Sequence, residues 1–157
     1  MITGIGIQNF RVFDEMTQID FAPITVLTGR NNSGKSSVLK ALLLLQDNAR
    51  KNNLTELDFN SSEHQLGTFQ EALSKNKKRN QSDEMVLCVK NDVVDEVATH
   101  LFFGSENIIL EQKYKLDDNG KKGNLAHITL KNDNEKFFFD AEIKIENFKK
   151  NQSFYLN

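Results

Sequence analysis

One segment of the sequence has the residue types and the spacing of a phosphate-binding loop. Residues 29–36 read Gly-Arg-Asn-Asn-Ser-Gly-Lys-Ser, which satisfies the pattern G-x-x-x-x-G-K-[ST] without a mismatch. Gly29 and Gly34 permit backbone turns that side chains would obstruct, so that successive backbone N–H groups can surround a phosphate. A helix that begins at the end of the loop adds its positive dipole end and its unpaired amides. This segment is therefore predicted to bind the phosphates of a nucleotide.

Two side chains of the loop have specific roles in that chemistry. Lys35 can place its charge against the β- and γ-phosphates, and the Ser36 hydroxyl can ligate Mg²⁺. The alternative interpretation is a glycine-rich turn between a strand and a helix that binds nothing. A chance match to four fixed positions is expected in about one of every few hundred chains of this size, because glycine makes up about 7% of residues. The nucleotide interpretation is favoured because an apolar run precedes the loop and an unbroken helical pattern follows it.

The elements on either side of the loop follow from local composition. Residues 24–28 are an uncharged and largely β-branched run, which predicts a strand buried on both faces. Residues 34–50 are rich in helix formers and predict a helix. Four consecutive leucines, 42–45, cover every side of it, so this helix is expected to be enclosed rather than to lie on a surface. The first thirty residues otherwise read as paired strands.

The rest of the chain divides into a polar connection and a strand-rich half. Residues 51–83 are polar, with Leu57 and Phe59 indicating a short strand. From residue 84 onward, apolar and polar residues alternate, which predicts an antiparallel β-subdomain with one solvent-facing side. A short helix is expected at 68–74, an exposed loop at 74–82, a hairpin turn at 117–123, and strands at 85–89, 97–103, 108–116, 125–130 and 137–145.

Composition limits the class of protein. The chain has 157 residues, of which 38% are hydrophobic and 27% charged, enough apolar material for one domain with its own core. A net charge of −2 argues against a strongly cationic binder of nucleic acids or membrane surfaces. No apolar run approaches the roughly 18–20 residues of a membrane span, and the single cysteine, Cys88, fits a reducing compartment. We therefore expect a cytoplasmic protein that does not enter a membrane.

Three segments of the N-terminal third resemble a known group of ATPases. Residues 5–13, 19–21 and 24–37 are similar to the opening of ABC-type ATPase heads of the RecF, SMC and OLD group. Residues 38–46 and 65–69 resemble prokaryotic AAA-type ATPases of that group, many of them encoded in anti-phage and mobile-element loci. The resemblance implies an α/β P-loop NTPase fold, with a mixed sheet around the P-loop helix and an antiparallel β-subdomain. Residues 1–157 would then be the N-terminal lobe of an ATPase domain that continues further: 1–50 carry the P-loop, 51–83 connect and 84–157 form the subdomain.

The same resemblance implies roles for individual residues. ATP and Mg²⁺ are the expected cofactors, and Ser36 is the expected metal ligand. Arg11, in the segment Asn-Phe-Arg, would lie beside the phosphates; the alternative is a solvated cation at a strand end. Gln65, rather than Gln46 or Gln70, would reach Mg²⁺ and the attacking water, although an ordinary surface glutamine is the simpler interpretation. The expected binding residues are Arg11, Asn31, Asn32, Ser33, Gly34, Lys35, Ser36 and Ser37, and no residue is predicted as a catalytic base.

Two motifs that such heads need for hydrolysis are missing from the sequence. A Walker B strand has four apolar residues before an aspartate, usually with a glutamate after it, and the signature helix is rich in serine and glycine. Residues 93–96 have only two apolar residues before their acids. Residues 137–140 have three, but Ala141 stands where the glutamate belongs, so Asp140 more simply occupies the polar face of a strand. We therefore expect ATP hydrolysis only in a complete protein.

Other constellations carry weaker signals. His64, His100 and His127 lack the spacing of a zinc site, and His100 and His127 are expected on strands as structural residues. The basic loop residues Lys75, Lys77, Lys78 and Arg79 could contact nucleic-acid phosphates, but a solvated loop explains them and is favoured.

Three functions compete. The leading hypothesis is an ATP-binding head that dimerises, or forms a higher homo-oligomer, to control a nuclease, another effector protein or DNA, with anti-phage defence implied by the resemblance alone. The second is a regulatory or structural subunit that binds nucleotide without hydrolysing it, which the missing Walker B motif favours. A GTPase or small-molecule kinase is third. Residues 76–79 depart from the guanine-reading pattern N-K-x-D, and the strand-rich second half differs from the alternating helices and strands of a kinase.

Overall fold

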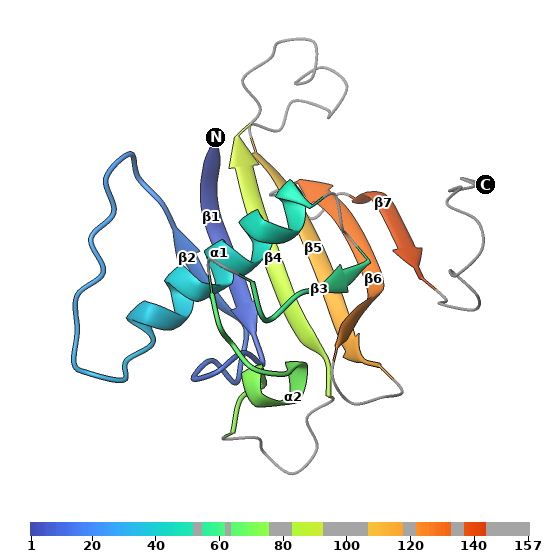
Figure 1. Ribbon diagram of the computed structural model, residues 1–157. Coiled ribbons are helices and arrows are strands. Elements are labelled where there is room, and N and C mark those ends of the chain that lie inside the picture. Colours follow the sequence, from blue (N-terminus) through green and yellow to red (C-terminus); the bar gives the residue numbers. More distant parts are fainter. Residues whose placement is uncertain are drawn as a thin grey trace.

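The computed structural model describes residues 1–51, 55–61, 64–75, 83–92, 107–117, 122–132 and 137–143. Among them the chain forms a sheet, one long helix and one short helix (Figure 1). In chain order the elements are β1 (Ile2–Gln8), β2 (Thr17–Asp20), α1 (Lys35–Arg50), β3 (Glu56–Leu57), α2 (Phe69–Ala72), β4 (Met85–Asp92), β5 (Asn107–Leu116), β6 (Gly123–Asn132) and β7 (Phe137–Glu142).

The strands form one sheet in the order β2-β1-β4-β5-β6-β3, and β7 also pairs with β6. Every pairing between the described strands is antiparallel. Helix α1 crosses one face of this sheet, and α2 lies near one end of the strands (Figure 1). The expected α/β class, with a helix after the glycine-rich loop and antiparallel strands in the second half, is confirmed.

The two faces of the sheet differ in character because successive strand residues point to opposite sides. On the face that α1 covers, apolar residues of β1, β4, β5 and β6 are buried together with Val38, Ala41 and Leu44 of the helix. The opposite face carries charged residues, including Glu111 of β5, which lies 3.5 Å from Lys113 and 3.6 Å from Lys131. The expected meander with one solvent-facing side is therefore confirmed for the strands that the structure describes.

Helix α1 is less enclosed than its leucine run predicts. Its buried residues line one face only, and Leu39 on the other side is 56% exposed. Leu42 and Leu45 pack at the edge of the core and remain half-buried. The prediction of an enclosed helix is wrong for the described structure, because α1 buries one face against the core and leaves Leu39 exposed to solvent.

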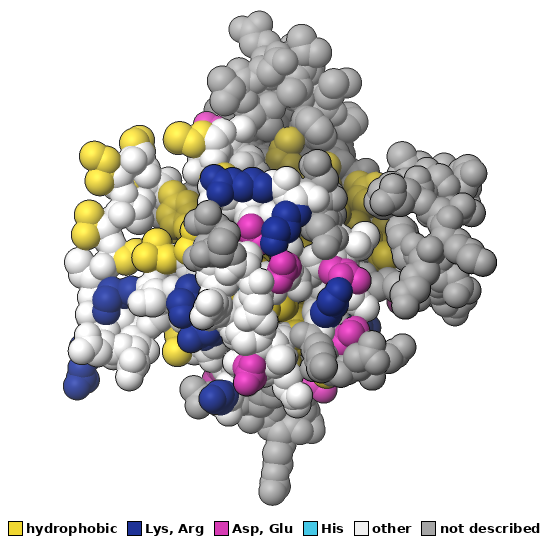
Figure 2. All heavy atoms as spheres, in the orientation of Figure 1, with side chains coloured by type: hydrophobic (Ala, Val, Ile, Leu, Met, Phe, Trp, Pro, Cys, Tyr) yellow, Lys and Arg dark blue, Asp and Glu magenta, His cyan; other side chains and the backbone are white. Residues whose placement is uncertain are grey.

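Residues 24–28 do not form the predicted buried strand. They belong to an extended loop between β2 and α1 that swings away from the sheet (Figure 1), with Ile24 85% and Val26 75% exposed. Figure 2 shows hydrophobic side chains gathered on this loop, at the left of the view. Because this run is outside the sheet, the described sheet contains no parallel pair and is antiparallel rather than mixed. The prediction of a buried strand at 24–28 is therefore wrong for the described structure, in which no neighbouring strand pairs with this run.

The other expected elements have their counterparts. Predicted strands at 85–89, 108–116, 125–130 and 137–145 correspond to β4, β5, β6 and β7, and the predicted short strand and short helix to β3 and α2. The hairpin turn after β5 is closed by the Asp117 amide, which donates to the Lys122 carbonyl at 2.9 Å. The predicted strand at 97–103 and most of the predicted loop at 74–82 lie outside the described residues. Within the described part of the chain, neither helix combines the length and apolarity needed to cross a membrane.

Candidate functional site

The glycine-rich loop turns sharply just before α1. Gly29, Asn32 and Gly34 have positive φ angles of 143°, 64° and 99°. Gly34 is also required by space, because a Cβ atom there would lie 2.8 Å from Cζ of Phe13 and 2.9 Å from Cγ2 of Val12. The loop therefore packs directly against the turn that follows β1, and a larger residue at position 34 would separate the two.

The start of α1 is open to an anion. Gly34 is the N-cap residue, no side chain accepts a hydrogen bond from the helix start, and the first turn contains no acidic residue. The first amides of a helix have no partner within the helix, and the helix dipole places partial positive charge at this end. The loop and helix start thus offer backbone donors and positive potential at one place, which is what a phosphate group requires.

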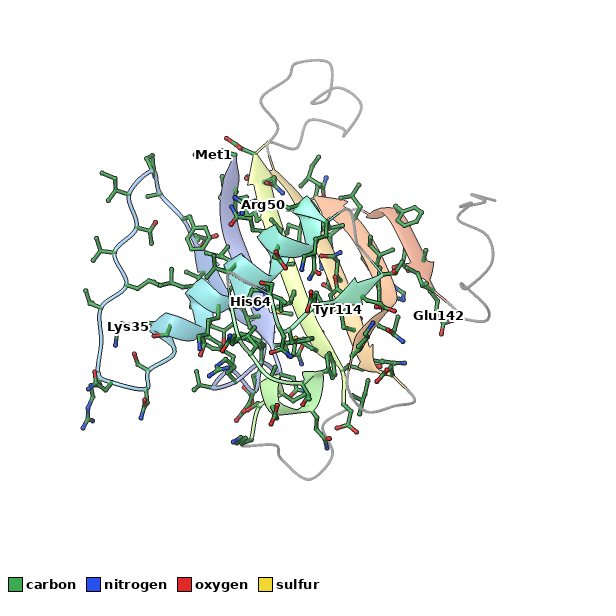
Figure 3. All side chains as sticks on the ribbon, in the orientation of Figure 1. Met1, Lys35, Arg50, His64, Tyr114 and Glu142 are labelled. Atoms are coloured by element: carbon green, nitrogen blue, oxygen red, sulfur yellow. The ribbon has the colours of Figure 1, made fainter. Side chains whose placement is uncertain are left out.

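The side chain of Lys35 folds back onto the loop that precedes it. Its Nζ donates to the carbonyl oxygens of Gly29 and Arg30, both at 2.7 Å, and lies 3.4 Å from Oγ of Ser33. Figure 3 labels Lys35 at the start of α1, beside this loop. No carboxylate is among the groups that hold its charge in the described structure. The ammonium group is therefore available to an anion that enters the loop.

A cavity of about 360 Å³ lies at the loop and brings the predicted binding residues together. Its three cations are Arg11, Lys35 and Lys40, and none of its lining residues is acidic. Val12 and Lys40 also line it but were not predicted from the sequence. Lys40 could have been found, because it lies four residues after Ser36 and therefore on the same side of the helix. The full lining is Arg11, Val12, Asn31, Asn32, Ser33, Gly34, Lys35, Ser36, Ser37 and Lys40.

The residues that line the cavity fit a nucleotide that carries its own Mg²⁺. The uniformly cationic lining suits a polyphosphate, and the exposed Ser36 hydroxyl suits a single contact to a metal ion. No group of three or more His, Cys, Asp or Glu residues in the described ranges could hold a metal ion. Mg²⁺ commonly keeps several waters and is bound through substrate phosphates with few protein ligands. The residues present therefore fit a metal that arrives with the nucleotide.

The predicted glutamines lie away from this cavity. Gln65 is exposed and forms an isolated β-bridge with Asn60 in the connection between β3 and α2. Gln46 and Gln70 are exposed on α1 and α2, and none of the three lines the cavity.

Asp140 belongs to the charged outer face of the sheet. It accepts hydrogen bonds from His127 at 2.6 Å and from Thr129 at 2.9 Å, and both lower the pKa of its carboxyl group. The structure places Asp140 on β7, opposite Thr129, and His127 on β6, which agrees with the simpler interpretation of Asp140 as a polar strand residue. The other candidate acids, at 93–96, and His100 lie outside the described residues.

A second cavity, of about 380 Å³, lies beside β3 and differs in charge. Each acid there has a basic partner at 2.7 Å: Glu56 pairs with Lys122, and Asp58 with Lys51. The pairing with Lys51 lowers the pKa of Asp58. Because its lining contains two acids, Glu56 and Asp58, and one lysine, Lys122, this cavity lacks the cationic character of the loop cavity.

The whole chain, residues 1–157, matches the family model of the AAA ATPase domain. The ATP/GTP phosphatase of Helicobacter pylori (strain ATCC 700392 / 26695) is 29% identical over 157 residues, covering 89% of this chain and 39% of that protein. The chain thus spans about two fifths of the length of this curated relative. A solved structure from work on ATP-driven dimerization and DNA-stimulated activation of SMC ATPases has a TM-score of 0.48 and 15% identity, covering 82% of this chain and 68% of that one.

Proposed function

The chain belongs to the AAA ATPase domain family, and we propose that it is an N-terminal lobe that binds Mg-ATP at the loop cavity. Residues 1–50 supply the site, 51–83 connect, and 84–157 form the strand-rich remainder of the lobe. The observation that carries this proposal is the cavity at the start of α1, whose lining contains Arg11, Lys35 and Lys40 and no acid.

Each part of the cavity has a defined task in the proposed complex. The backbone amides of the loop and of the first turn of α1 bind phosphate oxygens, and Lys35 exchanges its contacts with Gly29 and Arg30 for the β- and γ-phosphates. Arg11 faces the same phosphates from the turn after β1. The Ser36 hydroxyl would hold Mg²⁺ together with the nucleotide, and the ion would supply charge neutralisation at the phosphates.

Hydrolysis needs groups that the lining does not contain. In-line attack on the γ-phosphate requires a residue that positions the water, and carboxylates commonly complete the metal site. No carboxylate lines the cavity among the described residues. We therefore assign ATP hydrolysis to a longer or assembled protein in which another segment supplies these groups.

The exposed apolar segment at residues 24–28 supports the proposal that the lobe is part of a longer protein. Residues 24–28 are strand-forming by composition, and no described strand pairs with them. Leu39, on the uncovered side of α1, is exposed as well. Unpaired backbone groups and exposed apolar side chains favour addition of a strand. The matched relative is longer than this chain by more than half of its own length, so its additional polypeptide is the natural source of such a strand.

Assembly and biological role follow from the same proposal. Two heads would dimerise around nucleotide in the cytoplasm and control a nuclease, another effector or DNA, with anti-phage defence as one setting. These roles extend the resemblance of residues 1–50 to RecF, SMC and OLD heads.

A second candidate function is supported by one observation. Because the described lining lacks a carboxylate, the chain could bind ATP as a regulatory or structural subunit without turnover. Intact mass of the native gene product distinguishes the two, together with hydrolysis measured on that product and its co-purifying partners. Hydrolysis that requires a longer chain or a partner supports the ATPase. Tight ATP binding with no phosphate release under all these conditions supports the non-hydrolysing subunit.

Phosphate recognition itself is tested by comparing ligands. Equilibrium dialysis of the chain with ATP, GTP and adenosine, each with Mg²⁺, should show binding that requires the phosphates. Adenosine binding as tightly as ATP would remove the basis of the proposal, and a clear preference for GTP would move the chain to the GTPase class.

A further inference from the structure

Arg11 has a backbone conformation that an arginine seldom adopts. Its φ angle is 55°, and Asn9, two residues earlier, has a φ of 53°. The left-handed conformation is unfavourable for a residue with a side chain, because its Cβ atom lies too close to the following carbonyl oxygen. Such conformations persist only where the surrounding structure holds them in place. The contacts that hold this turn therefore determine where the guanidinium group of Arg11 can reach.

The turn is closed locally and attached to a distant segment. Phe10 and Phe13 exchange both of their backbone hydrogen bonds at 3.0 Å, and Phe10 is fully buried. Between them, the Arg11 amide donates to the Ala72 carbonyl of α2 at 2.8 Å. One residue beyond this pair, the Asp14 carboxylate accepts a hydrogen bond from the buried Ser74 hydroxyl. Two bonds thus connect the turn at residues 10–14 to the end of α2.

Although helix α2 is short, its cap and its buried side chains hold it in a fixed position. Its N-cap residue, Thr68, and Glu71 form a capping box, in which the Thr68 amide donates to Glu71 at 2.7 Å and the Glu71 amide to Thr68 at 3.2 Å. Phe69 and Ala72 are fully buried, and the Phe69 ring meets that of Phe59 edge-on at 5.6 Å. The end of α2 is therefore anchored in the core on the side of the Arg11 turn.

From this geometry we propose that Ser74 and Asp14 are positioning residues for Arg11. Their hydrogen bond, with that of Arg11 to Ala72, holds the left-handed turn so that the guanidinium group stays at the phosphate cavity before nucleotide enters. The inference rests on the proposed function, because it gives Arg11 a phosphate to contact. Fixing the backbone turn that carries this flexible charged side chain limits the region it samples and so reduces the entropy lost on binding. We call the Ser74–Asp14 hydrogen bond the brace. Removing it should weaken ATP binding by about three- to tenfold.

A double-mutant cycle separates positioning from general stability. ATP affinity is measured without turnover, using a non-hydrolysable ATP analogue, for the parent chain, Ser74→Ala, Arg11→Ala and the double variant. If the brace acts through Arg11, Ser74→Ala weakens binding in the parent but has no further effect once Arg11 is alanine. Equal losses in both backgrounds, or no loss in the parent, would overturn the inference. Thr17→Ala is the matched control, since it removes a hydroxyl that bonds the Glu15 carbonyl in the same region.

Asp14 provides a second variant with an opposing charge effect. Removing a negative charge near a phosphate site should by itself strengthen ATP binding, whereas loss of the brace weakens it. Asp14→Asn retains an oxygen that can accept from Ser74 and should bind ATP at least as well as the parent. Asp14→Ala should bind more weakly than Asp14→Asn. Weaker binding by Asp14→Asn than by Asp14→Ala would contradict the assigned role.

Hydrogen exchange tests the brace without nucleotide. In Ser74→Ala the Arg11 amide should exchange at least about tenfold faster, because its bond to Ala72 depends on an ordered turn. An unchanged exchange rate would overturn the inference while leaving the proposed function intact. A parent chain that binds no ATP, but whose Arg11 amide responds to Ser74→Ala, would instead overturn the proposed function and, with it, the purpose assigned to the brace.

Discussion

The Nζ atom of Lys35 lies 2.7 Å from the carbonyl oxygen of Gly29, so the lysine of the loop is hydrogen-bonded by the first residue of the same loop. This contact holds the charge where a phosphate would enter. Lys35→Ala should reduce ATP affinity by about 10- to 100-fold, because a hydrogen bond to a charged group contributes roughly 1.5–3 kcal/mol. The fold should survive, with a melting temperature within about 4 °C of the parent. Calorimetric titration and thermal unfolding check both, with Lys113→Ala on the outer face as control; unchanged ATP affinity would exclude the loop as the phosphate site.

Gly34 cannot be replaced without moving the turn beneath it. Its φ of 99° and the close approach of Val12 and Phe13 predict that Gly34→Ala lowers the free energy of unfolding by about 1–3 kcal/mol. ATP binding should weaken as well, because the loop would lift from the turn that carries Arg11. Urea unfolding and ATP titration measure the two effects. Ser33→Ala, in the same loop, should change stability by less than about 0.5 kcal/mol; equal effects of the two substitutions would argue against this packing.

Two leucines of α1 form a matched pair for testing its orientation. Leu44 is fully buried against the sheet, whereas Leu39 is 56% exposed. Leu44→Ala should lower the free energy of unfolding by about 2–5 kcal/mol, since it leaves a cavity in the core. Leu39→Ala should change it by less than about 0.5 kcal/mol in the 157-residue chain. Chemical denaturation of both variants measures this difference. A larger loss of unfolding free energy from Leu39→Ala than from Leu44→Ala would show that α1 packs its other face against the sheet.

Because Cys88 is buried, the free energy of unfolding should decrease at alkaline pH. Desolvation, with a smaller contribution from Glu111, raises the pKa of Cys88 from its ordinary value of 9.0 to about 12. Between these values the unfolded chain loses the thiol proton and the folded chain keeps it, so the free energy of unfolding falls as pH rises above about 9. Below that pH the thiol is protonated in both states and has no such effect. Urea unfolding from pH 8 to 10.5 should show a shallower decline for Cys88→Ala; identical slopes would mean that the thiol is not desolvated.

The sequence predicts well where the determinants are local. The pattern at 29–36 and the glycine-free stretch after it specify the loop and α1 because backbone freedom and helix propensity act over a few residues. The alternation in the second half likewise predicts strands with one polar face. Residues 24–28 show the limit of such reasoning: an apolar β-branched run indicates that burial is favourable but not which strand provides it.

The site was harder to predict where contacts join distant segments. Arg11 could be connected to the phosphates only through family resemblance, because its position depends on a turn that α2 holds in place. Val12 enters the cavity for the same reason. Residues 10–14 and the end of α2 lie about 60 residues apart in the sequence. No periodic pattern in the sequence indicates that they contact each other.

The exposed loop segment with Ile24 and Val26 also has a consequence for the purified chain in solution. Colloidal stability depends on mutual repulsion, and a net charge of −2 provides little of it at neutral pH. An uncharged β-branched run is then free to pair with its counterpart on another molecule. Turbidity of the 157-residue chain should therefore increase with concentration and salt. Val26→Glu, which places a charge in the run and makes the net charge more negative, should suppress it.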